Sequence, residues 1–501
     1  MEKIILNTEP YLAAQIQQII SQEFRLDELI EIDITSVKTA SIIIEEKSIF
    51  TLPQWYSDQL PVLFPPQIAF NNKTLLGLIF FQLGNFEKSA FYFSNYPQYL
   101  PIVELGHAMQ NALAVCEEDI IQIAASGNDK HTNLHNAALA QHYVSSESSF
   151  ESTSKAYEKA LHSCLLSERL ACTAKQYATF LTDNRLFSQA SQVIAPFVGS
   201  EILSKEAVIA IKVTACHNEM KQLSAPYDET LMSALKNDLW ECLQYYEAQK
   251  RSIETAFVLM DAAYIATLSN SYSEALGYIQ HAIKIFEQDQ LTEFTAQAQF
   301  QKANVLYTWA QNGNPQFYRE AMKACQDALK VFTRENAPGI FSDIHHQLGV
   351  IYSEIPDELK KKSVWAAVSV ASFSEALNYY NKVDFPYEFG VICNNQGNAY
   401  TKYPLALHSD NFDKALAWYR EALEVRGAST YPTERAITLL NYIEAAWHLG
   451  SEKEFDEALF NDMVSKASEV KTLNVSNELK QTANDHLREL QSLSDSVKSS
   501  V

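Results

Sequence analysis

Apolar positions recur every three or four residues along most of the chain, which is the spacing that buries one face of an α-helix. The pattern differs in the first 70 residues. There the segment 29–34 alternates between apolar and polar positions as a strand does, and Ile42, Ile43 and Ile44 form a β-branched run. Pro65 and Pro66 interrupt whatever precedes them. The pattern therefore predicts a helical protein with a small N-terminal cap of a different kind, all-α or α/β, with one hairpin.

A motif of small and aromatic residues recurs within the helical part. Its first clear copy has a large-small pair, a glycine followed by an aromatic residue, and a later small residue. These positions are Leu76, Gly77, Phe80, Gly84, Phe86, Ser89, Phe93 and Pro101. Further copies place a small residue early in a helix at Ala275, Ala321, Ala376 and Ala415, with a weaker copy ending at Ala458. Gly349 and Gly397 supply the small residue of the preceding helix in two of them.

The motif resembles the tetratricopeptide repeat (TPR), a pair of antiparallel helices. That resemblance implies an all-α fold, a right-handed α-solenoid of TPR-like helical hairpins that stack because no hairpin buries its apolar face alone. The alternative is a helical bundle without repeats, which apolar spacing by itself also allows.

The copies are longer than usual. The alanines of the second helices are 39 to 55 residues apart, compared with a TPR period of about 34. The extra residues include 312–317, 355–358 and 403–405, and we expect them to enlarge the turns between the two helices of a repeat. Long-period arrays of this kind resemble those that precede caspase-like (CHAT) protease domains in bacteria.

These patterns divide the chain into four parts. We expect the cap at 1–70, degenerate TPR-like repeats at 71–250, a TPR solenoid with enlarged inter-helix turns at 251–470, and a C-terminal capping helix with a frayed tail at 471–501.

Charge and composition narrow the function. The formal net charge is −22, from 39 basic and 61 acidic residues, which repels phosphate backbones and anionic lipid. We therefore expect a protein or peptide partner, with a basic one favoured, and neither nucleic acid nor membrane. The seven cysteines are widely spaced without a C-x-x-C pair, and no apolar run is long enough to span a bilayer. The seven cysteines are typical of reduced thiols in a cytoplasmic protein.

The sequence contains none of the short motifs that mark common enzymes. It lacks a phosphate-binding P-loop, G-x-G-x-x-G, H-E-x-x-H, G-x-S-x-G and an EF-hand loop. It also lacks the His-Gly dipeptide of the caspase-like proteases. We predict no enzyme activity, no cofactor and no metal site.

The family resemblance instead places a binding groove on the first helices of the repeats. Carried over onto this sequence, the groove positions are Met260, Tyr264, Phe300, Asn304, His346, Val350, Asn394, Asn398 and Thr401. None of them is basic, which argues against the lysine and arginine clamp by which some TPR proteins hold a C-terminal carboxylate.

Asparagine at these positions has two interpretations. An amide side chain offers a donor and an acceptor that match the N–H and C=O of an extended peptide. Alternatively, Asn304 and Asn398 close contacts between helices or face water. The sequence thus predicts a non-catalytic interaction scaffold; a regulatory or sensor subunit of a separately encoded enzyme, for example a caspase-like protease, is the alternative. It leaves the partner and the oligomeric state open.

Overall fold

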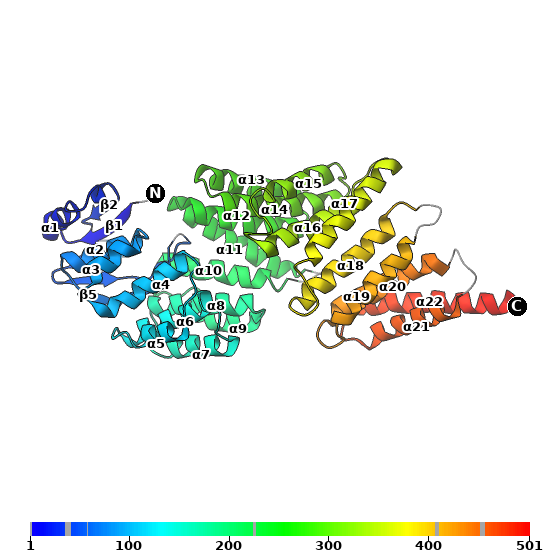
Figure 1. Ribbon diagram of the computed structural model, residues 1–501, viewed down its shortest axis with the longest axis horizontal. Helices are drawn as coiled ribbons and strands as arrows, with labels where there is room; N and C mark the ends of the chain where they lie inside the picture. The colour runs from blue at the N-terminus through cyan, green and yellow to red at the C-terminus, as the bar shows by residue number, and fades with distance from the viewer. Residues whose placement is uncertain are drawn as a thin grey trace. The chain divides into compact units, whose positions relative to one another are not determined.

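The computed structural model describes residues 3–35, 42–57, 59–223, 227–405, 410–450 and 456–500, with the side chains of 450 and 496–500 left aside. The chain divides into two compact units, Met1–Asp261 and Ala262–Val501. Figure 1 shows the elements of both in chain order. Each unit is described by itself below.

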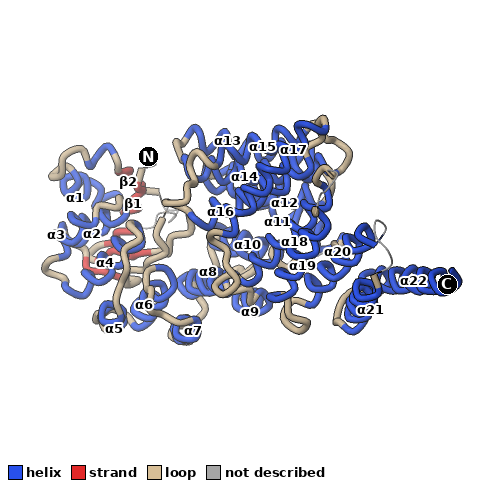
Figure 2. The backbone as a smooth tube through the Cα atoms, turned by 45° about the vertical axis from the view of Figure 1, so that its right-hand side comes forward, coloured by secondary structure: helices blue, strands red, loops and turns tan. Residues whose placement is uncertain are grey.

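The N-terminal cap is a mixed five-stranded sheet with the order β2-β1-β3-β4-β5. Its strands are β1 (Ile4–Thr8), β2 (Ile30–Asp33), β3 (Ile42–Glu45), β4 (Ser48–Thr51) and β5 (Gln67–Ala69). The central strand β1 is parallel to β2 and β3, while β3 and β4 form an antiparallel hairpin that β5 extends. In the described residues all strands belong to this sheet (Figure 2). The alternating and β-branched segments of the sequence correspond to β2 and β3, whereas β1 was not predicted.

The rest of the first unit is helical. Its helices are α1 (Pro10–Ile20), α2 (Asn72–Gln82), α3 (Phe86–Phe93), α4 (Leu100–Gln110), α5 (Glu117–Ala124), α6 (Lys130–Tyr143), α7 (Phe150–Leu161), α8 (Glu168–Asp183), α9 (Phe187–Ile194), α10 (Lys205–Met220) and α11 (Glu229–Ala248). Two 3₁₀ turns, Leu26–Glu28 and Pro97–Tyr99, connect some of them. The helices pair as antiparallel hairpins α2–α3, α6–α7, α8–α9 and α10–α11, and α8 packs on α10. The next helix, α12 (Ser252–Leu268), runs through the boundary of the two units.

The second unit consists of helices alone in its described residues. They are α13 (Tyr272–Gln288), α14 (Thr292–Gln311), α15 (Phe317–Ala328), α16 (Pro338–Glu354), α17 (Leu359–Leu377), α18 (Pro386–Lys402), α19 (Asn411–Val425), α20 (Pro432–Gly450), α21 (Glu457–Thr472) and α22 (Asn477–Ser500). The hairpins are α14–α15, α16–α17, α18–α19 and α20–α21, and their first helices α14, α16, α18 and α20 are successive neighbours. The fold is a mostly helical TPR-like repeat array with a small mixed sheet at its N-terminus.

Proline at the first helical position begins three successive first helices. Pro338, Pro386 and Pro432 open α16, α18 and α20. Proline suits that position because its fixed φ is already helical and its missing N–H is not needed there. The local sequence therefore specifies where these three helices begin.

Close crossings between glycines and aromatic rings occur in three of the hairpins, α2–α3, α16–α17 and α18–α19. A Cβ atom added at Gly77 would lie 2.7 Å from the ring of Phe93, and one at Gly397 would lie 2.5 Å from the ring of Tyr419. Gly349 faces Phe373 in the same way at 3.0 Å. The rings thus fill the space that the missing side chains leave, and the two backbones approach closely.

The alanines of the repeat motif mostly occupy the predicted crossings. Ala275, Ala321, Ala376 and Ala415 have no exposed surface. Ala458 is exposed on the first turn of α21, so its assignment to the register was wrong. The buried small residue of α21 is Ala467, two and a half turns later. The apolar spacing in α21 fits more than one register, and packing selects the register in which Ala467 is buried.

The extra length of the repeats takes two forms. Between α14 and α15 it is a five-residue connection, 312–316. Between α16 and α17 the connection has only four residues, 355–358, and the additional chain lengthens α17 to 19 residues. Its first turn is exposed, because α17 begins beyond the part of the hairpin that packs.

The crossing at Gly397 can be tested against a matched helical glycine. Gly397→Ala should lower the free energy of unfolding by about 1–3 kcal/mol, because the new methyl group overlaps the Tyr419 ring. The control is Gly277 in α13, where an added Cβ meets nothing within 4 Å. Gly277→Ala should raise stability by up to about 1 kcal/mol, since alanine loses less backbone entropy in a helix. Urea unfolding measures both, and equal effects would contradict the packing described here.

Candidate functional site

A pocket of about 450 Å³ lies in the second unit, where the ends of three first helices meet the beginning of α17. Gln311 ends α14, Glu354 ends α16 and Lys402 ends α18. Tyr318, Tyr352, Trp365 and Tyr403 supply aromatic walls. The pocket thus sits at the edge of the array where the repeats carry their extra residues.

The added turns of α17 build one wall of this pocket. The Trp365 ring stacks on Tyr352 of α16, with centroids 5.7 Å apart and an interplanar angle of 7°. Its indole Nε1 donates a hydrogen bond to Asp357 Oδ2 at 3.2 Å. Stacking on Tyr352 therefore holds the face of the indole, and the hydrogen bond to Asp357 holds its edge.

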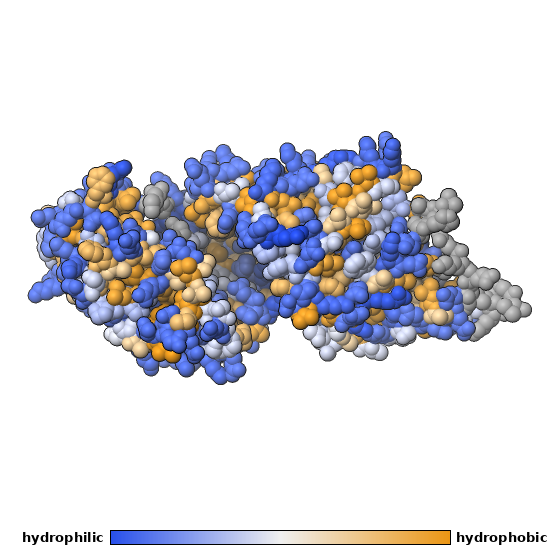
Figure 3. Space-filling view, in the orientation of Figure 1, coloured by the Kyte–Doolittle hydropathy of each residue, from blue (hydrophilic) through white to orange (hydrophobic). Residues whose placement is uncertain are grey.

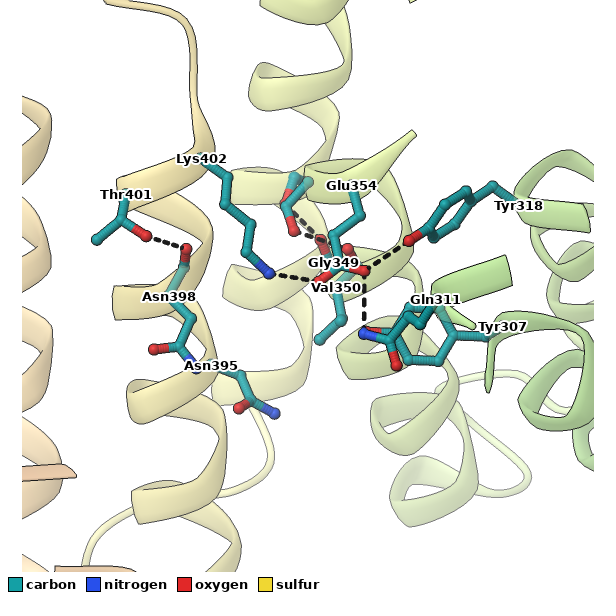
Figure 4. A network of polar contacts seen from close by, with 12 residues as sticks. Tyr307, Gln311, Tyr318, Gly349, Val350, Glu354, Asn395, Asn398, Thr401 and Lys402 are labelled. Atoms are coloured by element: carbon teal, nitrogen blue, oxygen red, sulfur yellow. Dashed lines mark hydrogen bonds and ion pairs between the residues drawn. The ribbon is translucent and has the colours of Figure 1, made fainter. Parts of the chain in front are cut away.

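Glu354 is the carboxylate at the centre of the pocket's polar contacts (Figure 4). Its side chain is 10% exposed, and Oε1 lies 2.5 Å from Nζ of Lys402. On Oε2 it accepts hydrogen bonds from the Tyr318 hydroxyl at 3.1 Å and from Gln311 Nε2 at 3.2 Å. Burial, together with this carboxylate, raises the pKa of Tyr318, so the phenol remains a donor. One oxygen of Glu354 thus faces neutral donors and the other faces a cation.

Asp357, three residues further on, is a second acid with little exposure, but it does not line the pocket. It pairs with Arg319 at 2.7 Å and with Lys361 at 3.5 Å. The hydrogen bond from Trp365, followed by contacts that include Arg319, lowers the pKa of Asp357 to about 2. This carboxylate fixes the beginning of α17 and is engaged by the chain itself.

The predicted groove residues occupy different environments. Tyr264 and Asn304 are exposed on α12 and α14. Phe300 and Val350 are half-buried against apolar clusters of the second unit. Met260 is buried and belongs to the first unit, whereas the other predicted groove residues belong to the second unit.

The polar groove residues of α16 and α18 are linked to one another. Asn395 donates from Nδ2 to Nε2 of His346 at 3.0 Å, which joins α18 to α16. Asn441 of α20 donates to Oδ1 of the buried Asn394 at 3.2 Å. A chain of polar side chains therefore crosses three successive first helices.

Asn398 and Thr401 bond within their own hairpin. Asn398 Oδ1 accepts a hydrogen bond from the Tyr419 hydroxyl at 2.7 Å, and the Thr401 hydroxyl donates to the Asn398 carbonyl oxygen. Asn304 differs from Asn398, because its exposed side chain makes no hydrogen bond within the described part of the chain. The two asparagines that the sequence presents as equivalent thus have unlike surroundings.

In the first unit, an extended segment of the chain lies on the first helices of the hairpins. Asn136 of α6 accepts a hydrogen bond from the Leu63 N–H at 3.0 Å and donates to the Leu63 carbonyl oxygen at 2.7 Å. One amide side chain therefore satisfies both backbone groups of a residue in an extended segment. Backbone recognition by an amide, which is one interpretation of Asn304 and Asn398 in the sequence, therefore occurs at Asn136.

Further polar groups hold the same segment. His135 of α6 contacts the Pro61 carbonyl oxygen at 2.9 Å, and Arg169 of α8 donates to that of Phe64 at 2.7 Å. Glu254 of α12 accepts from the Ser57 N–H at 2.8 Å. Trp55 and Leu63 are buried in one apolar cluster with residues of α8 and α10. The segment thus covers the first-helix face at α6 and α8.

Neither Asn136 nor Glu354 was identified from the sequence. Asn136 lies in a repeat too degenerate to give a reliable register. Glu354 directly precedes a turn that was predicted to be enlarged, so the position of the added residues was the available signal. No group of three or more potential metal ligands occurs in the described residues. None of the helices searched there is both long and apolar enough to cross a membrane.

No family model matches the chain, and no curated protein is significantly similar to it in sequence. Solved structures with related folds include the human IFIT1 dimer with PPP-AAAA, which is 13% identical with a TM-score of 0.49 and covers 84% of this chain and 90% of that one. The C-terminal part of a TPR repeat-containing protein from Cytophaga hutchinsonii is 13% identical with a TM-score of 0.33, covering 62% and 98%. The APC/C hetero-tetramer Cut9–Hcn1 is 12% identical with a TM-score of 0.34, covering 85% and 87%. Similarity at this level carries no argument about function.

The buried histidine that contacts the extended segment should make the fold sensitive to acid. Burial lowers the pKa of His135 to about 3 from its ordinary value of 6.5. Between these values the unfolded chain binds a proton that the folded chain does not, so stability falls as the pH decreases below 6.5. We expect a loss of about 2 kcal/mol from this residue between pH 7 and pH 5.

The measurement is urea unfolding of the wild type and of His135→Gln at both pH values. Only the change between the two pH values within each protein is compared, so any packing defect of the variant largely cancels. The variant should lose about 2 kcal/mol less than the wild type on acidification. An identical loss in both proteins would show that His135 does not titrate as described.

Proposed function

We propose that the chain is a non-catalytic interaction scaffold that binds an extended segment of a partner protein on the first-helix face of its second unit. The observation that carries this proposal is the contact of Asn136 with both backbone groups of Leu63. It supports the proposal because a first helix of this array already binds extended chain through an amide. Backbone recognition of this type is independent of sequence, and neighbouring side chains would supply specificity.

The two units differ in what remains accessible on this face. In the first unit the chain's own segment occupies it, with Leu63 and Trp55 buried. In the second unit, Tyr264 and Asn304 are exposed on first helices. Tyr264 offers an aromatic surface and Asn304 offers a donor and an acceptor, which together suit an extended segment with apolar side chains. The partner surface therefore belongs to the second unit.

Charge favours a basic partner. The net charge of −22 steers a basic protein toward the scaffold and repels nucleic acid and anionic membranes. This attraction acts mainly on the association rate and weakens with salt. We expect no cofactor, because the scaffold requires only surface complementarity.

The alternative function is a regulatory or sensor subunit of a separately encoded enzyme. Identification of the native partner distinguishes it from a scaffold. Affinity purification from the native host, followed by mass spectrometry, identifies what binds. A stoichiometric enzyme, for example a caspase-like protease, would favour a regulatory subunit. A range of client proteins would favour a scaffold.

Asn304 provides the test of the binding face. Asn304→Ala should weaken binding of the purified partner about fivefold, because roughly 1 kcal/mol of hydrogen bonding to the partner backbone is lost. The melting temperature should not change, since the Asn304 side chain makes no hydrogen bond in the described residues. Isothermal titration calorimetry and thermal unfolding measure the two quantities.

Asn398→Ala, two repeats further along the array, is the matched control. It removes the hydrogen bond from Tyr419 and should lower stability by about 1 kcal/mol. Unchanged affinity of Asn304→Ala, in a protein that still captures its partner, would exclude this face as the binding surface.

A further inference from the structure

The pocket beside Glu354 holds a buried negative charge next to a replaceable cation. The Glu354 side chain is 10% exposed, whereas that of Lys402 is 47% exposed. Lys402 approaches the carboxylate from the end of α18, on the side opposite Tyr318 and Gln311 (Figure 4). The carboxylate is therefore a fixed part of the wall, while the ammonium group reaches it on a long, half-exposed side chain.

The contacts of Glu354 leave one oxygen for a cation. Oε2 is held by the neutral donors Tyr318 and Gln311, which orient the carboxylate without neutralising it. Oε1 is neutralised by Lys402 alone among the described residues. Asp357 does not offer such a place, because it lies outside the pocket and both of its oxygens are bonded.

We propose that this pocket binds one arginine or lysine side chain of the partner, and that Lys402 occupies the carboxylate until the partner cation replaces it. This inference rests on the proposed scaffold function and identifies the side chain that would anchor the partner. The exchange replaces one cation on Glu354 by another, so the buried carboxylate is never left unpaired. Arginine has an advantage over lysine because its planar fork can bond a carboxylate through two N–H groups.

The walls of the pocket suit the same ligand. Tyr318, Tyr352, Trp365 and Tyr403 present aromatic surface, which attracts cations and packs against the methylene groups of a long side chain. The volume of about 450 Å³ lies within the range of ligand pockets and admits a long side chain.

Residues close in sequence to those that line the pocket indicate what flanks the basic residue. Leu359 and Val364 at the beginning of α17 are 68% and 59% exposed, and Leu405 is 60% exposed. Apolar side chains are also visible over α17 at the upper right of Figure 3. Lys362 lines the pocket and Lys360 and Lys361 precede it in sequence, which disfavours a run of basic residues. We therefore expect a single basic residue between apolar ones rather than a polybasic segment.

An anionic ligand is the competing interpretation, because Lys362 and Lys402 both line the pocket. The two interpretations predict opposite effects for the same substitution. If Lys402 competes with the ligand, removing its charge strengthens binding. If Lys402 binds the ligand, removing its charge weakens binding.

The probes are fluorescein-labelled peptides Leu-Leu-Arg-Leu-Leu, with the N-terminus labelled and the C-terminus amidated. In the second peptide citrulline replaces arginine, which keeps the shape and removes the charge, and in a third glutamate replaces it. Fluorescence anisotropy with the full chain measures their affinities. We expect the arginine peptide to bind at least tenfold more tightly than either of the others.

The variants test the roles of the two charged residues. Lys402→Met should strengthen binding of the arginine peptide at least fivefold, and Glu354→Gln should weaken it at least tenfold. The double variant, in which both charges are absent, should bind as weakly as Glu354→Gln. Thermal unfolding identifies any variant whose fold is disturbed. Lys402→Gln then replaces Lys402→Met, and Glu354→Met replaces Glu354→Gln, in the same measurements.

Several outcomes would overturn the inference. They are equal binding of the arginine and citrulline peptides, weaker binding by Lys402→Met, preferential binding of the glutamate peptide, or no binding by either the wild type or Lys402→Met. The scaffold function is tested separately with the native partner. A partner whose affinity responds to Asn304→Ala but not to Glu354→Gln would leave the scaffold in place and reject the pocket as its anchor.

Discussion

The contact between a glycine on one helix and an aromatic ring on the next determines how closely the helices approach in the hairpins α2–α3, α16–α17 and α18–α19. Gly77 and Gly397 face a ring at a distance that leaves no room for a methyl group, and Gly349 faces the Phe373 ring at a distance that is nearly as short. Because every hairpin depends on its neighbours to bury the rest of its apolar surface, this spacing is transmitted along the array. The first helices consequently line up as neighbours, α14 with α16, α16 with α18, and α18 with α20. The pocket beside Glu354 is built on the ends of α14, α16 and α18 in that row.

Polar side chains on the first helices obtain their hydrogen bonds in different ways in the two units. In the first unit Asn136 bonds to the backbone of Leu63, so an extended segment covers the helices. In the second unit His346 and Asn394 bond to side chains of the adjacent first helices instead. Buried amides require partners in either case. The same residue type thus serves as a peptide-binding group or as a link between helices, depending on whether an extended chain is present.

The residues beyond the ordinary repeat length produce the most distinctive local chemistry. By lengthening α17 they bring Trp365 onto Tyr352 and enclose the end of α16. Glu354 is therefore mostly removed from water, and its charge has to be balanced locally by Lys402. The longer repeat thus has a charged pocket at the edge of the array.

The sequence by itself determined the helical hairpins, because their signals are local: apolar spacing, the small residues at the crossings and proline at the helix starts all lie within one hairpin. It also indicated a separate N-terminal cap, although the buried central strand β1 has no alternating pattern to reveal it. Only the tertiary structure decided the contacts on which the proposed function rests. Asn136 and Leu63 are 73 residues apart in sequence, and Glu354 and Lys402 are 48 apart. Such pairs follow no period, since they depend on how whole helices and an extended segment come together.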